Sequence, residues 1–436
     1  MTPIDQAALS KAVAEAARHP SVACMAAGLD VVVRFGVAGG SHTGQASDLC
    51  IDARGVRVVP SSPERTASIE ITADGVAWAS AMDATPPPLY QSFSAWQLRN
   101  EAFKVDGDAL AIAQARSFLE CLVDRWHASS YEKATDAGLP SMSGIEGRYH
   151  RVEGPRGQVA DVFVETSGQG APLLCLHTAG SDSRQYHGVM ASHQLAKHWQ
   201  AIAFDMPAHG RSMPARPWDG EAYKLDQADY LAWCVAVIEQ VVRKPVTVLG
   251  CSMGAAMALV LAASRPDLVS AVVALEAPVR PRGRRNAFLT HAQVNGGWHT
   301  SAYVRGLMSP SSPVSHRRGA AWIYSQGAPG VYDGDLMFYS DEFDGELVAK
   351  SIDGKRTPVV LMTGDYDFSA VIADAHALSG WIEDSRVVEM PGLGHFPMTE
   401  HPAALLGYLL PELDRLRSMT DGSSDTPTRT KDLHDV

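Results

Sequence analysis

The sequence predicts an α/β protein in which a mostly parallel sheet carries helices on both faces, with a smaller α+β domain ahead of it. From residue 148 onward, apolar strand-like runs alternate with helical segments, which is typical of a parallel sheet. Residues 172–176, Pro-Leu-Leu-Cys-Leu, form a continuous apolar run, as expected for a strand buried on both faces. At 436 residues, the chain is long enough for two domains.

The first predicted domain spans residues 1–130. We expect it to open with a helix over residues 3–18, with Thr2 as the N-cap and Pro3 at the first helical position. Two of the following runs alternate apolar and polar residues, which indicates strands with one solvated face. The predicted elements are strands at 30–35, 48–52 and 67–72, a short helix at 75–82, a strand and turn at 103–108, and a long closing helix.

Residues 131–147 are polar and small, and we interpret them as a linker. The second domain covers residues 148–417, and the polar segment 418–436 is expected to lack a fixed structure. Residues 278–350 interrupt the alternation of strands and helices and are rich in Trp, Tyr and Met, which predicts a mostly helical cap. Its candidates for contacting a substrate are Trp298, Trp322, Tyr324 and Phe338.

Composition narrows the classes of partner and compartment. A net charge of −12 argues against binding nucleic acid or an anionic membrane surface. No apolar run is long enough to span a membrane, and residues 1–5 lack the features of a secretory signal. The six cysteines have neither paired nor metal-ligand spacing. We therefore expect a cytoplasmic protein with free thiols, no metal site and no cofactor.

The central motif lies in residues 246–256, Val-Thr-Val-Leu-Gly-Cys-Ser-Met-Gly-Ala-Ala. An apolar strand runs into Gly-x-Ser-x-Gly and then into a helix of small residues, so that Ser252 is predicted to project above the sheet. Gly250 and Gly254 leave room for a strained turn, and the helix N-terminus favours developing negative charge. The alternative is a Gly/Ser turn with no chemistry.

This segment resembles the nucleophile elbow of the α/β-hydrolase superfamily, whose members carry Ser, acid and His in that chain order. The resemblance implies that His395, in the glycine-flanked loop 390–397, is the base. It implies that Asp367, three residues after Gly364, is the acid. Asp365 and Glu276 are the competing acids, because some relatives place the acid after the earlier strand.

Two backbone N–H groups are expected to form the oxyanion hole. Met253, directly after the serine, supplies one of them. The loop at 177–180 supplies the other, where relatives usually read His-Gly-x-Gly and this chain reads His-Thr-Ala-Gly. That departure leaves Thr178 and Ala179 as alternatives, of which we favour Ala179. We expect His177 to brace the loop and His209 to pack in the neighbouring loop.

The predicted function is that of a cofactor-free serine hydrolase, which cleaves an ester or lactone of a mainly apolar small molecule through an acyl-enzyme. One alternative is a carbon–carbon bond hydrolase of ring-cleavage products, for which Arg305, Arg317 and Arg318 are candidate ligands of the substrate's acid group. Haloperoxidase-like or amidase activity and a non-catalytic binder of lipophilic ligands are further alternatives.

The first domain ends with a Lys-Val-x-Gly-Asp turn at residues 104–108 and a closing helix, and it resembles sterol-carrier-protein-2-like domains. That resemblance implies a hydrophobic tunnel for lipid-like ligands. The alternative is a small domain that packs on the enzyme or holds a homodimer together. Because no cluster of Ser, His and acid occurs in it, we expect this domain to support the enzyme without contributing chemistry.

Overall fold

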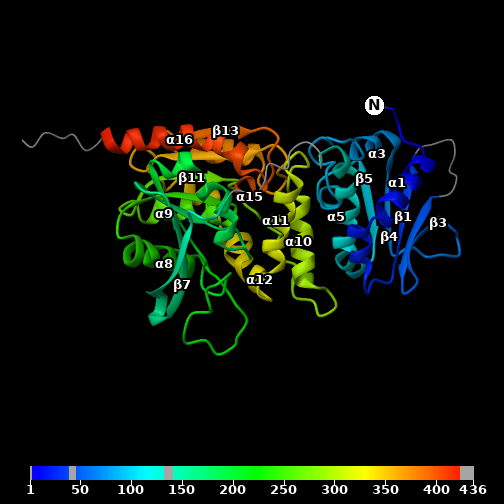
Figure 1. Ribbon diagram of the computed structural model, residues 1–436, viewed down its shortest axis with the longest axis horizontal. Coiled ribbons are helices and arrows are strands. Elements are labelled where there is room, and N and C mark those ends of the chain that lie inside the picture. The colour runs from blue at the N-terminus through cyan, green and yellow to red at the C-terminus, as the bar shows by residue number, and fades with distance from the viewer. Residues whose placement is uncertain (1, 39–45, 132–140, 423–436) are drawn as a thin grey trace, which may run out of the picture.

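The computed structural model describes residues 2–38, 46–131 and 141–422. Each predicted domain contains its own sheet, and the helices of the cap lie between the two sheets (Figure 1). The predicted linker falls mostly outside the described residues, at 132–140, and so does the part of the predicted tail from 423 to 436.

The first domain is a five-stranded sheet in the order β3-β2-β1-β4-β5, in which only the β1–β4 pair is parallel. A buried aromatic core fills its centre, where the Trp78 ring lies 5.1 to 6.4 Å from four other aromatic rings. Its elements are α1 (Gln6–Arg18), α2 (Pro20–Ala23), η1 (Cys24–Ala26), β1 (Val31–Ala38), β2 (Ser47–Asp52), β3 (Gly55–Pro60), β4 (Ile69–Asp74), α3 (Gly75–Ala81), α4 (Phe93–Leu98), β5 (Phe103–Gly107) and α5 (Ala109–Tyr131).

The start of the first helix differs from the prediction, and the turn at residues 104–108 has a clear structural reason. The first helix begins at Gln6 and not at residue 3, because the Asp5 side chain accepts the Ala8 N–H at 2.8 Å and serves as the N-cap. The turn at residues 104–108 needs its glycine, since a Cβ on Gly107 would lie 2.3 Å from the Ser68 carbonyl oxygen. Asp108 then caps α5 through the Ala111 N–H at 2.8 Å.

The second domain is built on an eight-stranded sheet in the order β13-β12-β11-β10-β8-β9-β7-β6. The strands from β8 to β13 are parallel, and the β6–β7 hairpin adds an antiparallel edge. Its strands are β6 (Glu146–Glu153), β7 (Val159–Ser167), β8 (Ala171–Leu176), β9 (Trp199–Phe204), β10 (Val246–Cys251), β11 (Val269–Leu275), β12 (Val359–Gly364) and β13 (Arg386–Met390). The principal helices packed on them are α8 (Gln227–Val237), α9 (Met253–Ser264), α14 (Ile372–Trp381) and α16 (Pro402–Gly422).

Helix α8 begins at Gln227, because the Asp226 side chain caps it by accepting the Asp229 N–H at 2.7 Å. The last helix continues to Gly422, so residues 418–422 of the predicted tail are helical. No helix in the described part of the chain is long and apolar enough to cross a membrane.

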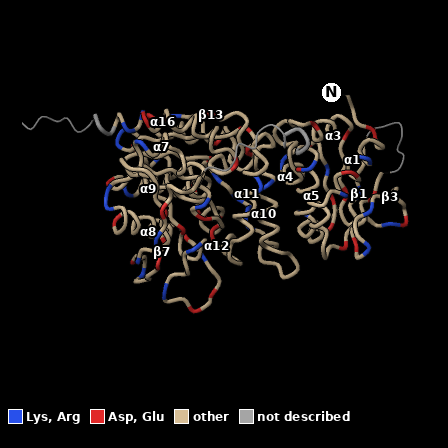
Figure 2. The backbone as a smooth tube through the Cα atoms, viewed as in Figure 1, with Lys and Arg blue, Asp and Glu red and all other residues tan. Residues whose placement is uncertain are grey.

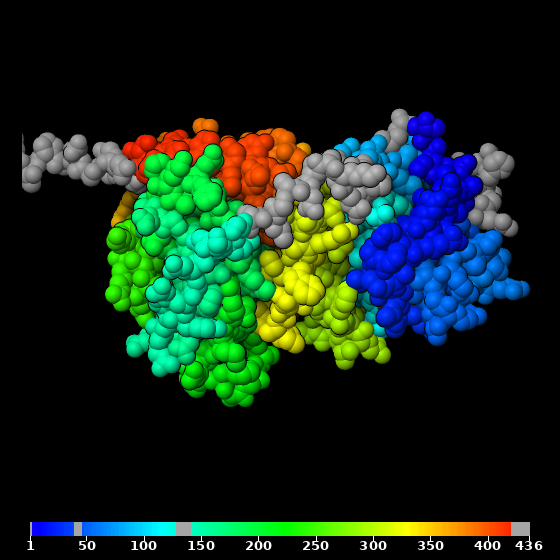
Figure 3. All heavy atoms as spheres, in the orientation of Figure 1, coloured from blue at the N-terminus to red at the C-terminus, as the bar shows by residue number. Residues whose placement is uncertain are grey.

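The cap consists of short helices that lie between the two sheets, and the space-filling view shows it in contact with both domains (Figure 3). Helix α10 packs along α5 of the first domain, and Asp124 of α5 forms ion pairs with Arg305 and Arg317 of the cap. These two arginines therefore belong to the domain interface. The cap elements are α10 (Gly296–Gly306), α11 (Val314–Ser325), α12 (Val331–Leu336), the π-helical turn η6 (Met337–Glu342) and α13 (Gly345–Ala349).

Candidate active site

Ser252 lies at the sharp turn between β10 and α9, with φ of 55° and ψ of −114°. This is a strained backbone conformation for a residue with a side chain. The turn is possible only because glycines flank it. A Cβ on Gly250 would lie 2.1 Å from the Gly254 carbonyl oxygen, and a Cβ on Gly254 would lie 2.2 Å from that of Leu176.

Ser252, His395 and Asp367 form a continuous hydrogen-bonded row. The Ser252 Oγ lies 2.8 Å from His395 Nε2, and His395 Nδ1 lies 2.6 Å from Asp367 Oδ2. All three side chains are buried. Because the carboxylate accepts the Nδ1 proton, Nε2 carries a free lone pair toward the serine hydroxyl, which is the tautomer that a general base needs.

The two competing carboxyl groups occupy different positions. Asp365 accepts the Gly392 N–H at 2.7 Å and holds the loop that carries His395. Glu276 is fully buried, accepts the Gly364 N–H at 3.0 Å and hydrogen-bonds to Asp367. Burial and then the neighbouring Asp367 charge raise the pKa of Glu276 well above its usual range, so Glu276 is neutral.

The loop after β8 has one unengaged amide, at Ala179, which lines the same cavity as Ser252. The Thr178 N–H donates to Gln185 Oε1 at 3.0 Å, and the Gly180 N–H donates to Asp335 Oδ2 at 2.7 Å. The Ala179 N–H between them has no acceptor among the described residues, and neither does the Met253 N–H at the start of α9. The prediction that Thr178 could be the second oxyanion donor is therefore wrong, because its amide already donates to Gln185.

Two buried histidines brace this loop through hydrogen bonds. His177 donates from Nδ1 to the Thr178 carbonyl at 2.9 Å and accepts the Met206 N–H at Nε2, at 3.2 Å. His209 Nε2 donates to Asp335 at 2.8 Å. Burial lowers the pKa of His209, but the Asp335 carboxylate outweighs burial and raises it overall. These contacts give both histidines bracing positions.

The cavity at Ser252 is narrow, with a volume of about 20 Å³. The Tyr339 hydroxyl of η6 lies 3.0 Å from Ser252 Oγ, and Tyr324 also lines the cavity and hydrogen-bonds to the Thr178 hydroxyl. Burial raises the pKa of Tyr339, so its phenol stays protonated.

Three of the four aromatic residues predicted to contact substrate lie outside this cavity. Trp298 and Trp322 are 48% and 64% exposed, and Phe338 packs in the core against Tyr230 and Phe343. The cavity instead receives Tyr339 and Tyr332 from the same aromatic-rich stretch. Their neighbours Phe338 and Val331 face the core, because consecutive helical residues point in different directions.

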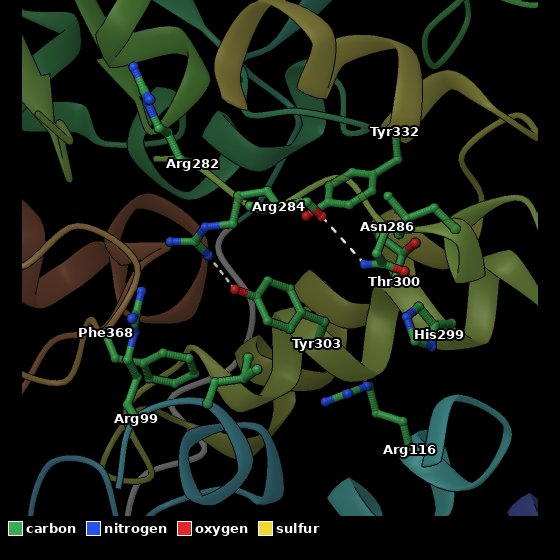
Figure 4. Close-up of a pocket in the computed structure, with 13 residues that line it drawn as sticks. Arg99, Arg116, Arg282, Arg284, Asn286, His299, Thr300, Tyr303, Tyr332 and Phe368 are labelled. Atoms are coloured by element: carbon green, nitrogen blue, oxygen red, sulfur yellow. Dashed lines mark hydrogen bonds between the residues drawn. The ribbon is translucent and has the colours of Figure 1, made fainter. Parts of the chain in front are cut away.

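A second, larger cavity of about 260 Å³ shares the side chains of Arg284, Tyr303 and Tyr332 with the cavity at Ser252 (Figure 4). Arg99 and Arg116 of the first domain line its other side. The first domain is therefore closer to the site than the sequence led us to expect.

These features define an α/β-hydrolase site, and the comparisons agree on the class. The sequence model of the alpha/beta hydrolase fold family matches residues 171–402, and the chain belongs to that family.

Among particular proteins, the chain is similar to the (E)-2-((N-methylformamido)methylene)succinate hydrolase of Acinetobacter baylyi. The two are 28% identical over 203 residues, which cover 44% of this chain and 74% of that protein. An esterase from Thermogutta terrifontis, solved with malate bound, superimposes with a TM-score of 0.54 at 15% identity, over 62% of this chain and 99% of that one. The enol-lactonase of Burkholderia xenovorans LB400 superimposes with a TM-score of 0.52 at 18% identity, over 61% of this chain and 99% of that one. The two superpositions show the shared fold.

Proposed function

We propose that the protein is a serine hydrolase that cleaves a carboxylic ester or lactone through an acyl-enzyme on Ser252. The observation that carries the proposal is the unbroken hydrogen-bonded row from Ser252 through His395 to Asp367. A buried serine hydroxyl needs a base to become a nucleophile, and this row supplies both the base and the group that orients it.

In the proposed reaction, Ser252 Oγ attacks the substrate carbonyl while His395 Nε2 takes the hydroxyl proton. The negative charge that develops on the carbonyl oxygen is stabilised by the unengaged amides of Ala179 and Met253. His395 then gives its proton to the leaving alcohol. A water molecule, activated by the same histidine, hydrolyses the acyl-enzyme.

Tyr339 is the cap's contribution to this site. The Ser252 hydroxyl is oriented to donate to the Tyr339 phenol oxygen at 3.0 Å, and the same Oγ lies 2.8 Å from His395 Nε2. Tyr339 therefore holds the serine Oγ in place before the reaction, and the serine proton turns from Tyr339 to His395 as attack begins, which gives Tyr339 a positioning role. None of these steps uses a cofactor.

The comparisons support hydrolysis in general terms, because the similar proteins include a named hydrolase, an esterase and an enol-lactonase. A carbon–carbon bond hydrolase is the second candidate. Such an enzyme needs a cation to bind the acid group of its substrate. Arg284 lines the cavity at Ser252 and fits that role, in place of Arg305 and Arg317, which pair with Asp124.

The test is covalent labelling of the full chain with a fluorophosphonate, followed by intact-mass analysis. We expect one adduct in the wild type and none in Ser252→Ala, together with a loss in kcat of roughly 10³- to 10⁶-fold. Cys251→Ala is the neighbouring control and should still be labelled, because its thiol donates to the His395 carbonyl and takes no part in the row. An adduct that persists in Ser252→Ala would overturn the assignment.

A further inference from the structure

We propose that the cavity between the two domains binds an anionic group of the substrate, a carboxylate or a phosphate, through Arg116 of the first domain and Arg284 of the second. The proposal rests on the proposed function in one respect, namely that the anion belongs to the molecule cleaved at Ser252. It deepens that function by naming a substrate class, an ester or lactone with a negatively charged end. This differs from the mainly apolar substrate that the sequence predicts.

The lining of the cavity is strongly basic. Four arginines line it, and none of the described residues in its wall is Asp or Glu. This contrasts with the chain as a whole, whose net charge is −12. Figure 2 shows Lys and Arg segments near α4, α10 and α11, where the two domains meet. A concave site with positive walls attracts and retains anions.

Arg116 is a buried cation that has no hydrogen-bonded carboxylate partner among the described residues. It is 8% exposed and extends from α5 toward the cavity (Figure 4). Its terminal nitrogens donate to the neutral side chains of Ser94 and Gln97, at 2.8 and 2.6 Å. Its Nε has no acceptor at all among the described residues. A buried charge left in this state is costly, and an anionic ligand would compensate it.

One carboxyl group, Glu120, lies near Arg116, but it neutralises the guanidinium only in part. Glu120 Oε1 accepts two hydrogen bonds from Ser94, and no ion pair joins it to Arg116. Burial raises the pKa of Glu120 to about 7, so this carboxyl is only about half ionised in neutral solution. Arg116 therefore keeps an excess positive charge at the wall of the cavity.

Arg284 faces Arg116 across the cavity and connects it to the reaction centre. Its guanidinium donates to the Tyr303 hydroxyl and, at 2.9 Å, to the Ser369 carbonyl, two residues after Asp367. Arg284 lines both cavities, and so do Tyr303 and Tyr332. A substrate whose carbonyl lies at Ser252 would extend past these three side chains and place its other end between Arg284 and Arg116.

The remaining two arginines differ in exposure and direction. Arg99, at the end of α4, is exposed at the rim beside Phe368, whereas Arg282 points away from the other side chains (Figure 4). We assign Arg99 to the capture of the anion at the entrance and give Arg282 no role. His299 adds no charge, since burial and Arg116 lower its pKa to about 4.

The experiment measures anion binding separately from catalysis. Titration calorimetry on full-length Ser252→Ala uses adipate, inorganic phosphate and the neutral diamide adipamide as probes. We expect saturable binding of at least one anion, weakened by salt, and no binding of adipamide. Arg116→Gln should weaken anion binding roughly tenfold or more, as expected for the loss of a hydrogen bond to a charged group. Arg54→Gln, which removes an exposed arginine paired with Asp52 on the first domain, should bind like the parent.

Two further variants guard against a misfolded Arg116→Gln. Arg116→Lys keeps the positive charge and should retain part of the affinity. Arg99→Gln is exposed and should fold normally while slowing anion capture. Preference for adipate indicates a carboxylate substrate, and preference for phosphate indicates a phosphorylated one. Anion binding that is absent from the parent, or is equal in the parent and a folded Arg116→Gln, would overturn the proposal.

A kinetic measurement then relates the site to the reaction. Two p-nitrophenyl esters of equal length are compared, one ending in a carboxylate and one ending in a methyl group. The carboxylate-terminated ester should have the higher kcat/KM, so that its value divided by that of the methyl-terminated ester exceeds one. That ratio should fall in Arg116→Gln. If anions bind but no ester is hydrolysed, the anion site is supported and the proposed function is wrong. If esters are hydrolysed but no anion binds, the proposed function is supported and the anion site is wrong.

Discussion

Glu276 donates a hydrogen bond from its carboxyl group to Asp367, the carboxylate whose Oδ2 is hydrogen-bonded to His395 Nδ1. The two acids therefore differ in charge, because burial and the Asp367 carboxylate keep Glu276 protonated. Glu276 also has a positive φ of 51°, an uncommon conformation for a residue with a long side chain. We infer that Asp367 is the charged acid beside His395, and that Glu276 holds the Asp367 carboxylate in position.

We predict that Asp367→Asn lowers kcat by roughly 10²- to 10⁴-fold, because an amide in this position favours the wrong histidine tautomer. Glu276→Gln should change kcat only slightly, since a neutral amide can still donate to Asp367. Steady-state kinetics on an activated ester would measure both. Asp365→Asn is the matched control in the same loop, and its side-chain oxygen can still accept the Gly392 N–H. A Glu276→Gln enzyme as impaired as Asp367→Asn would contradict this assignment.

Asp335 is expected to act on turnover without contacting the substrate. Its Oδ2 accepts both the Gly180 N–H and His209, and so fixes the loop that presents Ala179. Asp335→Asn should lower kcat roughly 10²-fold with little change in KM, because the oxyanion donor is displaced. Asp333→Asn, in the same helix but paired with Arg285 at the surface, should leave kcat unchanged. Equal effects from the two variants would argue against a positioning role for Asp335.

The buried carboxyl of Glu120 predicts a pH dependence of stability. Its pKa is raised from 4.5 to about 7 in the folded chain, so between these values the folded state holds a proton that the unfolded chain releases. The stability that this proton contributes is present below pH 4.5 and is lost as the pH rises toward 7. Glu120→Gln keeps the acceptor for Ser94 and has no such loss. As the pH rises from 4.5 to above 7, the free energy of unfolding of Glu120→Gln should therefore increase relative to that of the wild type by up to roughly 3 kcal/mol.

Urea unfolding of the two proteins at pH 4.5, 6 and 8 would measure this difference, with Glu101→Gln, at an exposed site, as the control. Comparison between variants removes the contribution of Glu400, whose pKa burial also raises to about 7. A difference that stays constant with pH would show that Glu120 is ionised in the folded protein.

Asp124 should be essential for the contact between the domains. It pairs with Arg317, which is buried, and with Arg305, so its removal leaves two cations at the interface without their partner. Asp124→Asn should lower the free energy of unfolding by about 3 to 5 kcal/mol, as measured by urea unfolding. Asp52→Asn, which disrupts surface pairs in the same domain, should have no measurable effect. A stable Asp124→Asn variant would mean that the interface depends on apolar packing alone.

The sequence predicted the second domain well because its signals are local. An apolar run, two glycines and a serine within eleven residues are enough to place Ser252 at a turn, and the structure has that turn. The candidate base and acid follow strands of the same parallel sheet, whose carboxyl ends share one edge, and the structure brings them together. Strand β3 was not predicted, because this edge strand has no buried residues to mark it.

The rest of the site depends on contacts between distant segments. Arg116 and Arg284 are 168 positions apart, and nothing in either local sequence distinguishes them from surface arginines. Phe338 and Tyr339 are adjacent and both aromatic, yet only Tyr339 faces Ser252. Which of the two points inward depends on the π-helical turn at 337–342, and this turn has no clear sequence signal.

The narrowness of the cavity at Ser252 also bears on the rate of the reaction. A space of about 20 Å³ is comparable to one water molecule, so an acyl group cannot enter while Tyr339 stays against the serine. We therefore expect each turnover to include an outward movement of η6 or of its tyrosine, and a return before the serine is aligned again. If this movement is slower than bond cleavage, kcat will fall as solvent viscosity rises and will vary little with the leaving group of the ester.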